Sequence, residues 1–123
     1  AEIQIFMSNN IGNNFPFWAM IILLPLIVWI FGLIGIHPII TSAPILSLFG
    51  PLLSLWEAAF LMQAHLIGWC AGTATSFTSL SVLTTAENFR LHISKLVLGP
   101  NLFATGCLTF IGAILLITLN YLF

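Results

Sequence analysis

The longest charge-free interval of the chain lies in its first half. No Asp, Glu, Lys or Arg stands between Glu2 and Glu57, and most residues in between are aliphatic or aromatic. As α-helix, rising about 1.5 Å per residue, this interval could cross the roughly 30 Å hydrocarbon core of a bilayer twice. A water-soluble domain needs charge to cover its surface, and charged residues make up only 4% of this chain. The sequence therefore predicts an integral membrane protein.

The hydrophobic segments do not alternate polar and apolar residues, as the strands of a membrane barrel would. Residues 21–36 and 111–119 are almost continuously apolar. The α-helix is the other structure that satisfies its own backbone within lipid. We therefore predict an all-α integral membrane protein with about three spanning helices, short half-helices and a broken-helix hairpin. We expect the lipid bilayer to surround it. With a net charge of −1 and only two Lys or Arg residues, the chain lacks the basic patch that nucleic-acid binding requires.

Proline and glycine divide the hydrophobic part into separate helices. Pro16 suits a first helical turn, and Gly35 followed by Pro38 should end the first helix. The predicted helices span residues 16–36, 39–49, 55–71, 80–89 and 101–122 of a single membrane domain (16–123), after a polar lead-in at 1–15. The second helix is too short to cross comfortably. No basic region precedes the first helix, so we expect it to be a retained span and not a signal peptide.

Eight hydroxyl side chains gather between Gly72 and Glu87 in a chain that is otherwise mostly apolar. We predict a helix break near residues 73–79 at membrane depth, where free backbone groups and hydroxyls could coordinate Na⁺ or hold an oxyanion. The candidate site residues are Thr73, Thr75, Ser76, Thr78, Ser79 and Ser81. Alternatively, the hydroxyls bond back to carbonyls of their own helix or join neighbouring helices.

The few charged side chains allow specific predictions. Glu87 precedes Arg90 by three residues, which favours a helical ion pair, and a carboxylate that couples transport to H⁺ is the alternative. Glu57 is expected to cap the helix that follows Gly50-Pro51. Arg90 and Lys95 are the only basic residues, so the positive-inside rule places their connection on the cytoplasmic side of an inner or plasma membrane.

His65 lies in the middle of a predicted helix, with Phe60 and Trp69 nearby in sequence. It is expected to be either a satisfied buried imidazole or an axial ligand of haem or chlorophyll. It forms no spaced pair with another histidine, so no metal site is predicted. The chain contains no Asp from which a Ser-His-Asp triad could be built, and it has no glycine-rich phosphate motif. Enzyme activity is not expected.

Short motifs follow one another in a familiar order: Gly35-Ile-His-Pro38, Leu48-Phe-Gly-Pro-Leu52, Gly68-Trp69 before the hydroxyl-rich segment, and Gly99-Pro-Asn-Leu102. In this order the chain resembles the C-terminal part of permeases of the ion-transporter superfamily, which includes divalent-anion/sodium symporters and arsenite permeases. The resemblance covers roughly residues 8–122 and implies helical hairpins with sites at their tips.

The resemblance extends to Ser8, Asn9 and Asn10, which are similar to the Ser-Asn hairpin tips of these permeases. It therefore implies that these three residues also belong to the candidate site. This sequence is much shorter than such permeases, without their scaffold helices or first repeat. The resemblance therefore implies other membrane chains, or a homo-oligomer, as partners.

Two functions remain open from the sequence. The first is a membrane-embedded portion of a secondary transporter for an ion or small anion, a symporter coupled to Na⁺ or H⁺, with its site at the helix break. The second is a small structural or cofactor-holding subunit of a multi-subunit membrane complex, with a pigment or haem near His65. The first requires a discontinuous helix facing a polar cavity, whereas the second requires continuous helices against other chains.

Overall fold

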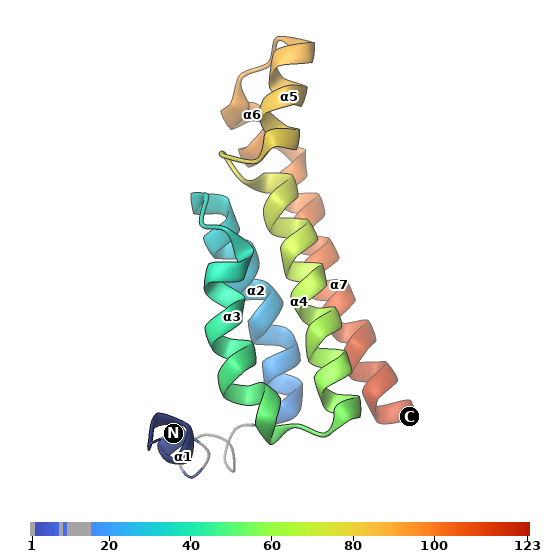
Figure 1. Ribbon diagram of the computed structural model, residues 1–123. Helices are drawn as coiled ribbons and strands as arrows, with labels where there is room; N and C mark the ends of the chain where they lie inside the picture. Colours follow the sequence, from blue (N-terminus) through green and yellow to red (C-terminus); the bar gives the residue numbers. More distant parts are fainter. Residues whose placement is uncertain (1, 8, 10–15) are drawn as a thin grey trace.

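The computed structural model describes residues 2–7, 9 and 16–123, and these residues form helices and connecting turns without a strand. In chain order the elements are α1 (Glu2–Met7), α2 (Phe17–Ile34), α3 (Pro38–Phe49), the 3₁₀ turn η2 (Gly50–Leu52), α4 (Leu55–Thr75), α5 (Leu80–Phe89), α6 (Ile93–Leu98) and α7 (Pro100–Leu122) (Figure 1). Three segments are long and apolar enough to cross a membrane: Phe17–Ile34, Leu55–Phe89 and Pro100–Leu122. The prediction of an all-α chain with three spanning segments is confirmed.

The turn between α2 and α3 forms at the predicted glycine and proline. Gly35 is left-handed, with φ of 95°, and its N–H donates to the carbonyl of Gly32 at 3.0 Å. This is a common way to end a helix, because glycine adopts a positive φ without a Cβ clash. His37 then caps α3: the N–H of Ile39 donates to His37 Nδ1 at 3.3 Å. Helices α2 and α3 consequently form a hairpin.

Helix α4 begins with a capping box. Ser54 Oγ accepts the N–H of Glu57 at 3.3 Å, and Glu57 Oε2 accepts the N–H of Ser54 at 2.9 Å. The two residues thus satisfy each other's backbone donors, which the first turn of a helix leaves free. The predicted capping role of Glu57 is confirmed.

The predicted end of this helix at Ala71 is wrong, because α4 continues to Thr75. Thr73 Oγ1 donates to the carbonyl of Trp69 at 2.9 Å, and Thr75 Oγ1 donates to the carbonyl of Ala71 at 2.8 Å. Threonine hydroxyls that bond one turn back are satisfied without leaving the helix. The break is therefore shorter than predicted and covers residues 76–79.

Helices α2 and α4 pack through a seam of glycines. A Cβ on Gly32 would lie 2.7 Å from the Cα of Gly72, and a Cβ on Gly68 would lie 2.7 Å from the Cα of Pro25. Small residues let membrane helices approach until their backbones touch. We refer to Gly32, Gly68 and Gly72 as the glycine seam. It confirms that the spacing of Gly68 and Gly72 permits close helix contact.

Helix α7 packs against both α4 and α2 and completes a three-helix core. Trp29 of α2 donates its indole N–H to Thr105 Oγ1 of α7 at 3.2 Å, and Leu116 of α7 packs with Phe60 and Ala64 of α4. In the view of Figure 1, α4 is drawn between the α2–α3 hairpin and α7, and α5 and α6 extend beyond the α2–α3 turn. The 21 residues of α4 measure about 31 Å, close to the thickness of a hydrocarbon core, so the break after Thr75 lies at one end of a span.

Candidate functional site

Two helix interruptions meet at the same end of the bundle. The α2–α3 turn lies beside the α4–α5 break, although some forty residues separate them in the sequence (Figure 1). Between them lies a hollow of about 260 Å³, which we call the polar hollow. It is lined by Gly32, Gly35, Ile36, His37, Pro38, Gly72, Thr73, Ser76, Thr78, Ser79 and Leu80. Four of the six hydroxyl residues predicted for the site, Thr73, Ser76, Thr78 and Ser79, are among them.

Ser76 shapes the break. Its backbone leaves the helix with φ of −73° and ψ of 133°, and its hydroxyl accepts the N–H of Thr78 at 3.3 Å. The N–H of Ser79 donates to the carbonyl of Ser76 at 3.3 Å. Serine hydroxyls that bond the backbone two residues on favour a turn over a helix. The hydroxyl-rich sequence thus produces the interruption locally.

Thr78 joins the two interruptions. Its Oγ1 donates to the carbonyl of Gly35 at 3.5 Å and lies 3.2 Å from Ser76 Oγ. A Cβ on Gly35 would lie 2.9 Å from Thr78 Cγ2, so the two segments are in tight contact. Gly35 is therefore required twice, once by its positive φ and once by the proximity of Thr78.

The hollow is polar without carrying charge. The N-terminal ends of α3 and α5 border it at Pro38 and Leu80, and the C-terminal ends of α2 and α4 reach it near Gly35 and Ser76. Helix starts present N–H groups and positive dipole ends, whereas helix ends present carbonyls. Hydroxyls can donate or accept. None of the residues lining the hollow is Asp, Glu, Lys or Arg, so its polar character comes from dipoles and hydroxyls alone.

No family model, curated protein or solved structure matches this chain. The resemblance to ion-transporter permeases therefore stays a prediction.

Three of the other predicted site residues, Thr75, Ser81 and Asn9, do not line the polar hollow. Thr75 is fully buried within α4, and Ser81 lines a neighbouring hollow, with its Oγ 2.8 Å from Ser79 Oγ. Asn9 is exposed, while Ser8 and Asn10 lie outside the described residues. The contribution of Ser8, Asn9 and Asn10 to the site stays a prediction.

The predicted ion pair between Glu87 and Arg90 is not formed in the described part of the chain. Arg90 ends α5 in a left-handed conformation, with φ of 52°, so the chain leaves the helical path that would bring the two side chains together. Both residues are exposed. Glu87 lies near the end of α5, away from the residues that line the polar hollow, and its predicted coupling role stays a prediction.

Asn101 is a residue that the sequence analysis missed. Its side-chain Nδ2 donates to the carbonyl of Ala74, in the last turn of α4. The bond satisfies a carbonyl that a helix end leaves without an intrahelical partner. It also fixes the start of α7 against the α4–α5 break. The only signal in the sequence was an amide directly after Gly99-Pro100 in an apolar chain, and nothing there indicated its partner.

His65 is buried, with 5% of its surface exposed, and its ring meets the edge of Trp69 at a centroid distance of 5.4 Å. Trp69 also makes an edge contact with His37, at 5.5 Å. The expectation of a satisfied imidazole is wrong for one nitrogen, since His65 Nδ1 is buried without a hydrogen-bond partner among the described residues. The alternative role of His65, as an axial ligand of haem or chlorophyll, stays a prediction.

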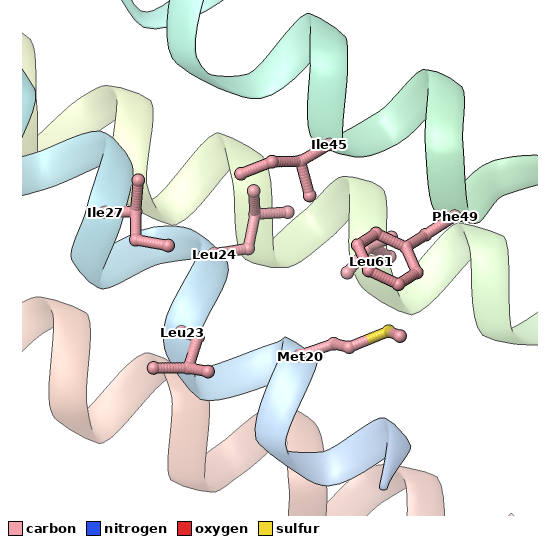
Figure 2. A pocket seen from close by; sticks show the side chains of 7 residues that line it. All are labelled: Met20, Leu23, Leu24, Ile27, Ile45, Phe49 and Leu61. Carbon is pink, nitrogen blue, oxygen red and sulfur yellow. The ribbon is translucent and has the colours of Figure 1, made fainter. Parts of the chain in front are cut away.

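A second hollow lies along the side of the bundle, between the α2–α3 hairpin and α4. Its volume is also about 260 Å³, and its lining is entirely apolar; we call it the apolar pocket. Figure 2 shows side chains from three helices around it: Met20, Leu23, Leu24 and Ile27 of α2, Ile45 and Phe49 of α3, and Leu61 of α4. It offers no group that could orient a polar solute.

Proposed function

We propose that this chain is the membrane-embedded portion of a secondary transporter and that the polar hollow binds its ion or small anion. One observation carries the proposal: two helix interruptions, distant in sequence, converge on one hydroxyl-lined hollow. Helix ends leave backbone N–H and carbonyl groups that protein, water or a ligand must satisfy. Broken helices in transporters use such groups to bind substrates and coupling ions.

The neutral lining favours an ion of low charge. No carboxylate among the lining residues would balance a divalent cation, and no ammonium or guanidinium would balance a multiply charged anion. The only imidazole among the lining residues is that of His37, and its Nδ1 already accepts the backbone N–H of Ile39 at 3.3 Å. Na⁺ is therefore the coupling ion that we propose, with H⁺ requiring a group elsewhere, such as Glu87.

The proposed transporter needs partners. The polar hollow lies at one end of α4 and opens at the surface of this chain, so other membrane chains or a second copy would enclose it. We further propose an inner or plasma membrane location, with the Arg90–Lys95 connection on the cytoplasmic side.

A structural subunit of a membrane complex is the second candidate. It is supported by the hydroxyls of Thr73, Thr75, Thr84 and Thr85, each of which donates to a carbonyl of its own helix. Such hydroxyls are satisfied without a ligand. In this case the polar hollow would be a packing feature and would not respond to ions.

The two candidates can be separated by measuring ion binding to the full chain in lipid nanodiscs. We expect NaCl to raise the unfolding temperature, followed by tryptophan fluorescence, relative to choline chloride at the same ionic strength, because a bound ion stabilises the folded state. Parallel titrations of sodium salts that differ in the anion would reveal an anion as the ligand.

Ser76→Ala and Thr84→Val form the matched pair for this experiment. Ser76→Ala removes a hydroxyl that lines the hollow and should abolish most of the ion-dependent shift. Thr84→Val removes an exposed hydroxyl that bonds the carbonyl of Leu80 at 2.7 Å and should leave the shift unchanged. If no small ion stabilises the wild-type chain, or if both variants respond like the wild type, the transporter proposal fails.

A further inference from the structure

The basic side chains of this protein are confined to one end. Arg90 and Lys95, the only Lys or Arg in the sequence, are both exposed and lie in and next to the α5–α6 connection. Large apolar side chains are exposed beside them, among them Phe89, at 71%, and Leu98, at 59%. Cations mixed with exposed aromatic and aliphatic groups are typical of surfaces at the membrane–water interface.

Lys95 borders a hollow between α5, α6 and the start of α7, which we call the basic hollow. Its volume is about 520 Å³, and it is lined by Thr85, Lys95, Leu96, Pro100, Asn101 and Ala104. A smaller hollow of about 200 Å³ shares Thr85, Leu96 and Asn101 with it and adds the hydroxyl residue Ser81. An ammonium group and hydroxyls therefore line two adjacent hollows, and neither hollow shares a lining residue with the polar hollow.

The start of α7 adds to the positive potential of the basic hollow. This helix has 23 residues and begins at Pro100, and its N-cap Gly99 provides no side-chain hydrogen bond. Pro100 has no N–H, and the N–H of Leu102 donates to the carbonyl of Gly99 at 3.1 Å, so this first turn contributes mainly the positive end of a long helix dipole. No acidic residue lines the hollow. The nearest in sequence, Glu87, follows Thr85 by two positions on α5, and residues two apart do not face each other on a helix.

An apolar track leads away from the basic hollow along α7. Ala104 lines the hollow, and Leu108, Ile111 and Leu115 follow it at helical spacing on the same face. All four residues are exposed. The track from 104 to 115 measures about 16 Å at 1.5 Å per residue. A ligand that fits both parts has an anionic head and a long apolar tail.

We propose that the basic hollow binds the phosphate headgroup of an anionic phospholipid, with Lys95 as its charge partner and an acyl chain along the exposed face of α7. Charge complementarity selects an anionic headgroup, and the apolar track selects a lipid over a soluble anion. The bound lipid would hold α5 and α6 against the start of α7, where Asn101 is bonded to the end of α4. This inference is independent of the proposed ion site.

Lipid retention by the full chain tests the proposal. The purified protein is washed with detergent after exposure to equal amounts of phosphatidylglycerol and phosphatidylcholine, and native mass spectrometry counts the lipids that remain bound. We expect the wild-type chain to retain phosphatidylglycerol preferentially. Lys95→Gln should reduce this retention about fivefold, because one basic residue near anionic lipid contributes about 1 kcal/mol. Lys95→Arg keeps the positive charge and should reduce retention by less than about twofold.

Two further variants make the result specific. Ala104→Phe fills the basic hollow without removing a charge and should also reduce retention of phosphatidylglycerol. Arg90→Gln removes the other cation, which does not line the hollow, and should have the smaller effect. Retention that is unchanged in both Lys95→Gln and Ala104→Phe would overturn the proposal, as would equal losses in Lys95→Gln and Arg90→Gln. Displacement of the lipid by inorganic phosphate alone would instead identify a site for a soluble anion.

Discussion

Two hollows of the same volume, about 260 Å³, lie beside the α2–α3 hairpin and α4, yet only one of them has polar groups in its lining. The apolar pocket lies where the three helices run past one another, and only side chains reach it (Figure 2). The polar hollow lies where helices stop, and there N–H groups, carbonyls and hydroxyls become available. The polarity of a space in this protein therefore depends on whether its helices continue, and not on its size.

The glycine seam determines where the polar hollow forms. Because Gly32 contacts Gly72, the end of α2 is brought level with the end of α4. The α2–α3 turn and the α4–α5 break are then neighbours, and Thr78 reaches Gly35. A different register between α2 and α4 would leave two separate interruptions and no shared hollow.

The largest effect is expected from changing the seam. Gly68→Ala places a Cβ 2.7 Å from the Cα of Pro25, a backbone atom that cannot move aside alone, so we expect a loss of about 1–3 kcal/mol in the free energy of unfolding. This loss can be measured by unfolding the protein in mixed micelles with an increasing fraction of sodium dodecyl sulfate. Gly50→Ala is the matched control, since a Cβ there meets nothing within 4 Å. Equal stability of the two variants would show that the seam does not set the contact.

The turn at the polar hollow should be nearly as sensitive. Gly35→Ala must adopt a φ of 95° and meets Thr78 Cγ2 at 2.9 Å, so a loss of about 1–2 kcal/mol is expected. Part of this loss should be recovered in a Thr78→Ala background, which removes the steric contact and leaves the backbone strain. A double-mutant cycle on the free energy of unfolding measures the coupling. If the changes in the free energy of unfolding of the two single variants simply add in the double variant, Thr78 makes no steric contact with the side chain at position 35.

A smaller effect is expected at the bond between α7 and α4. Asn101→Leu leaves the carbonyl of Ala74 without its side-chain donor and should lower the free energy of unfolding by about 1 kcal/mol. It should also speed hydrogen exchange in the last turn of α4, because that turn loses its link to α7. Asn120→Leu, at the other end of the same helix, serves as the control. Similar exchange in both variants would contradict the proposed link.

The smallest effect concerns the apolar pocket. Leu23→Phe adds volume to its lining and is expected to stabilise the chain by about 0.5 kcal/mol, with no change in the ion response of the polar hollow. Ile30→Phe, on the same helix but outside the pocket, is the matched variant and should have no effect on stability. A changed ion response in Leu23→Phe would indicate that the two hollows are coupled.

Several features of the fold were predictable because their causes are local. Gly35 and Pro38 end one helix and start another whatever surrounds them, and Glu57 caps α4 from within the same turn. The end of α4 was predicted too early, because Thr73 and Thr75 were expected to leave the helix and instead bond back to it. Sequence spacing alone does not distinguish these two uses of a threonine hydroxyl.

Other features depend on contacts between distant residues. Asn101 bonds Ala74, which lies 27 positions earlier, and no local pattern indicates such a partner. The spacing of Glu87 and Arg90 suited an ion pair, but the left-handed backbone of Arg90 ends the helix before the pair can form. The predicted hydroxyl residues divide for the same reason: Ser76 and Thr78 face the polar hollow, whereas Thr75 is turned into the bundle.

By itself the sequence determined that the chain is helical, that it suits a membrane and where its helices are interrupted. Scarce charge, long apolar runs and paired glycines and prolines act through solvation and backbone geometry within a few residues. Only the tertiary structure decided that the two interruptions meet and line a common hollow. The physical reason is the glycine seam, because backbone contact between α2 and α4 fixes their relative position, and that position depends on the shape of both helices together.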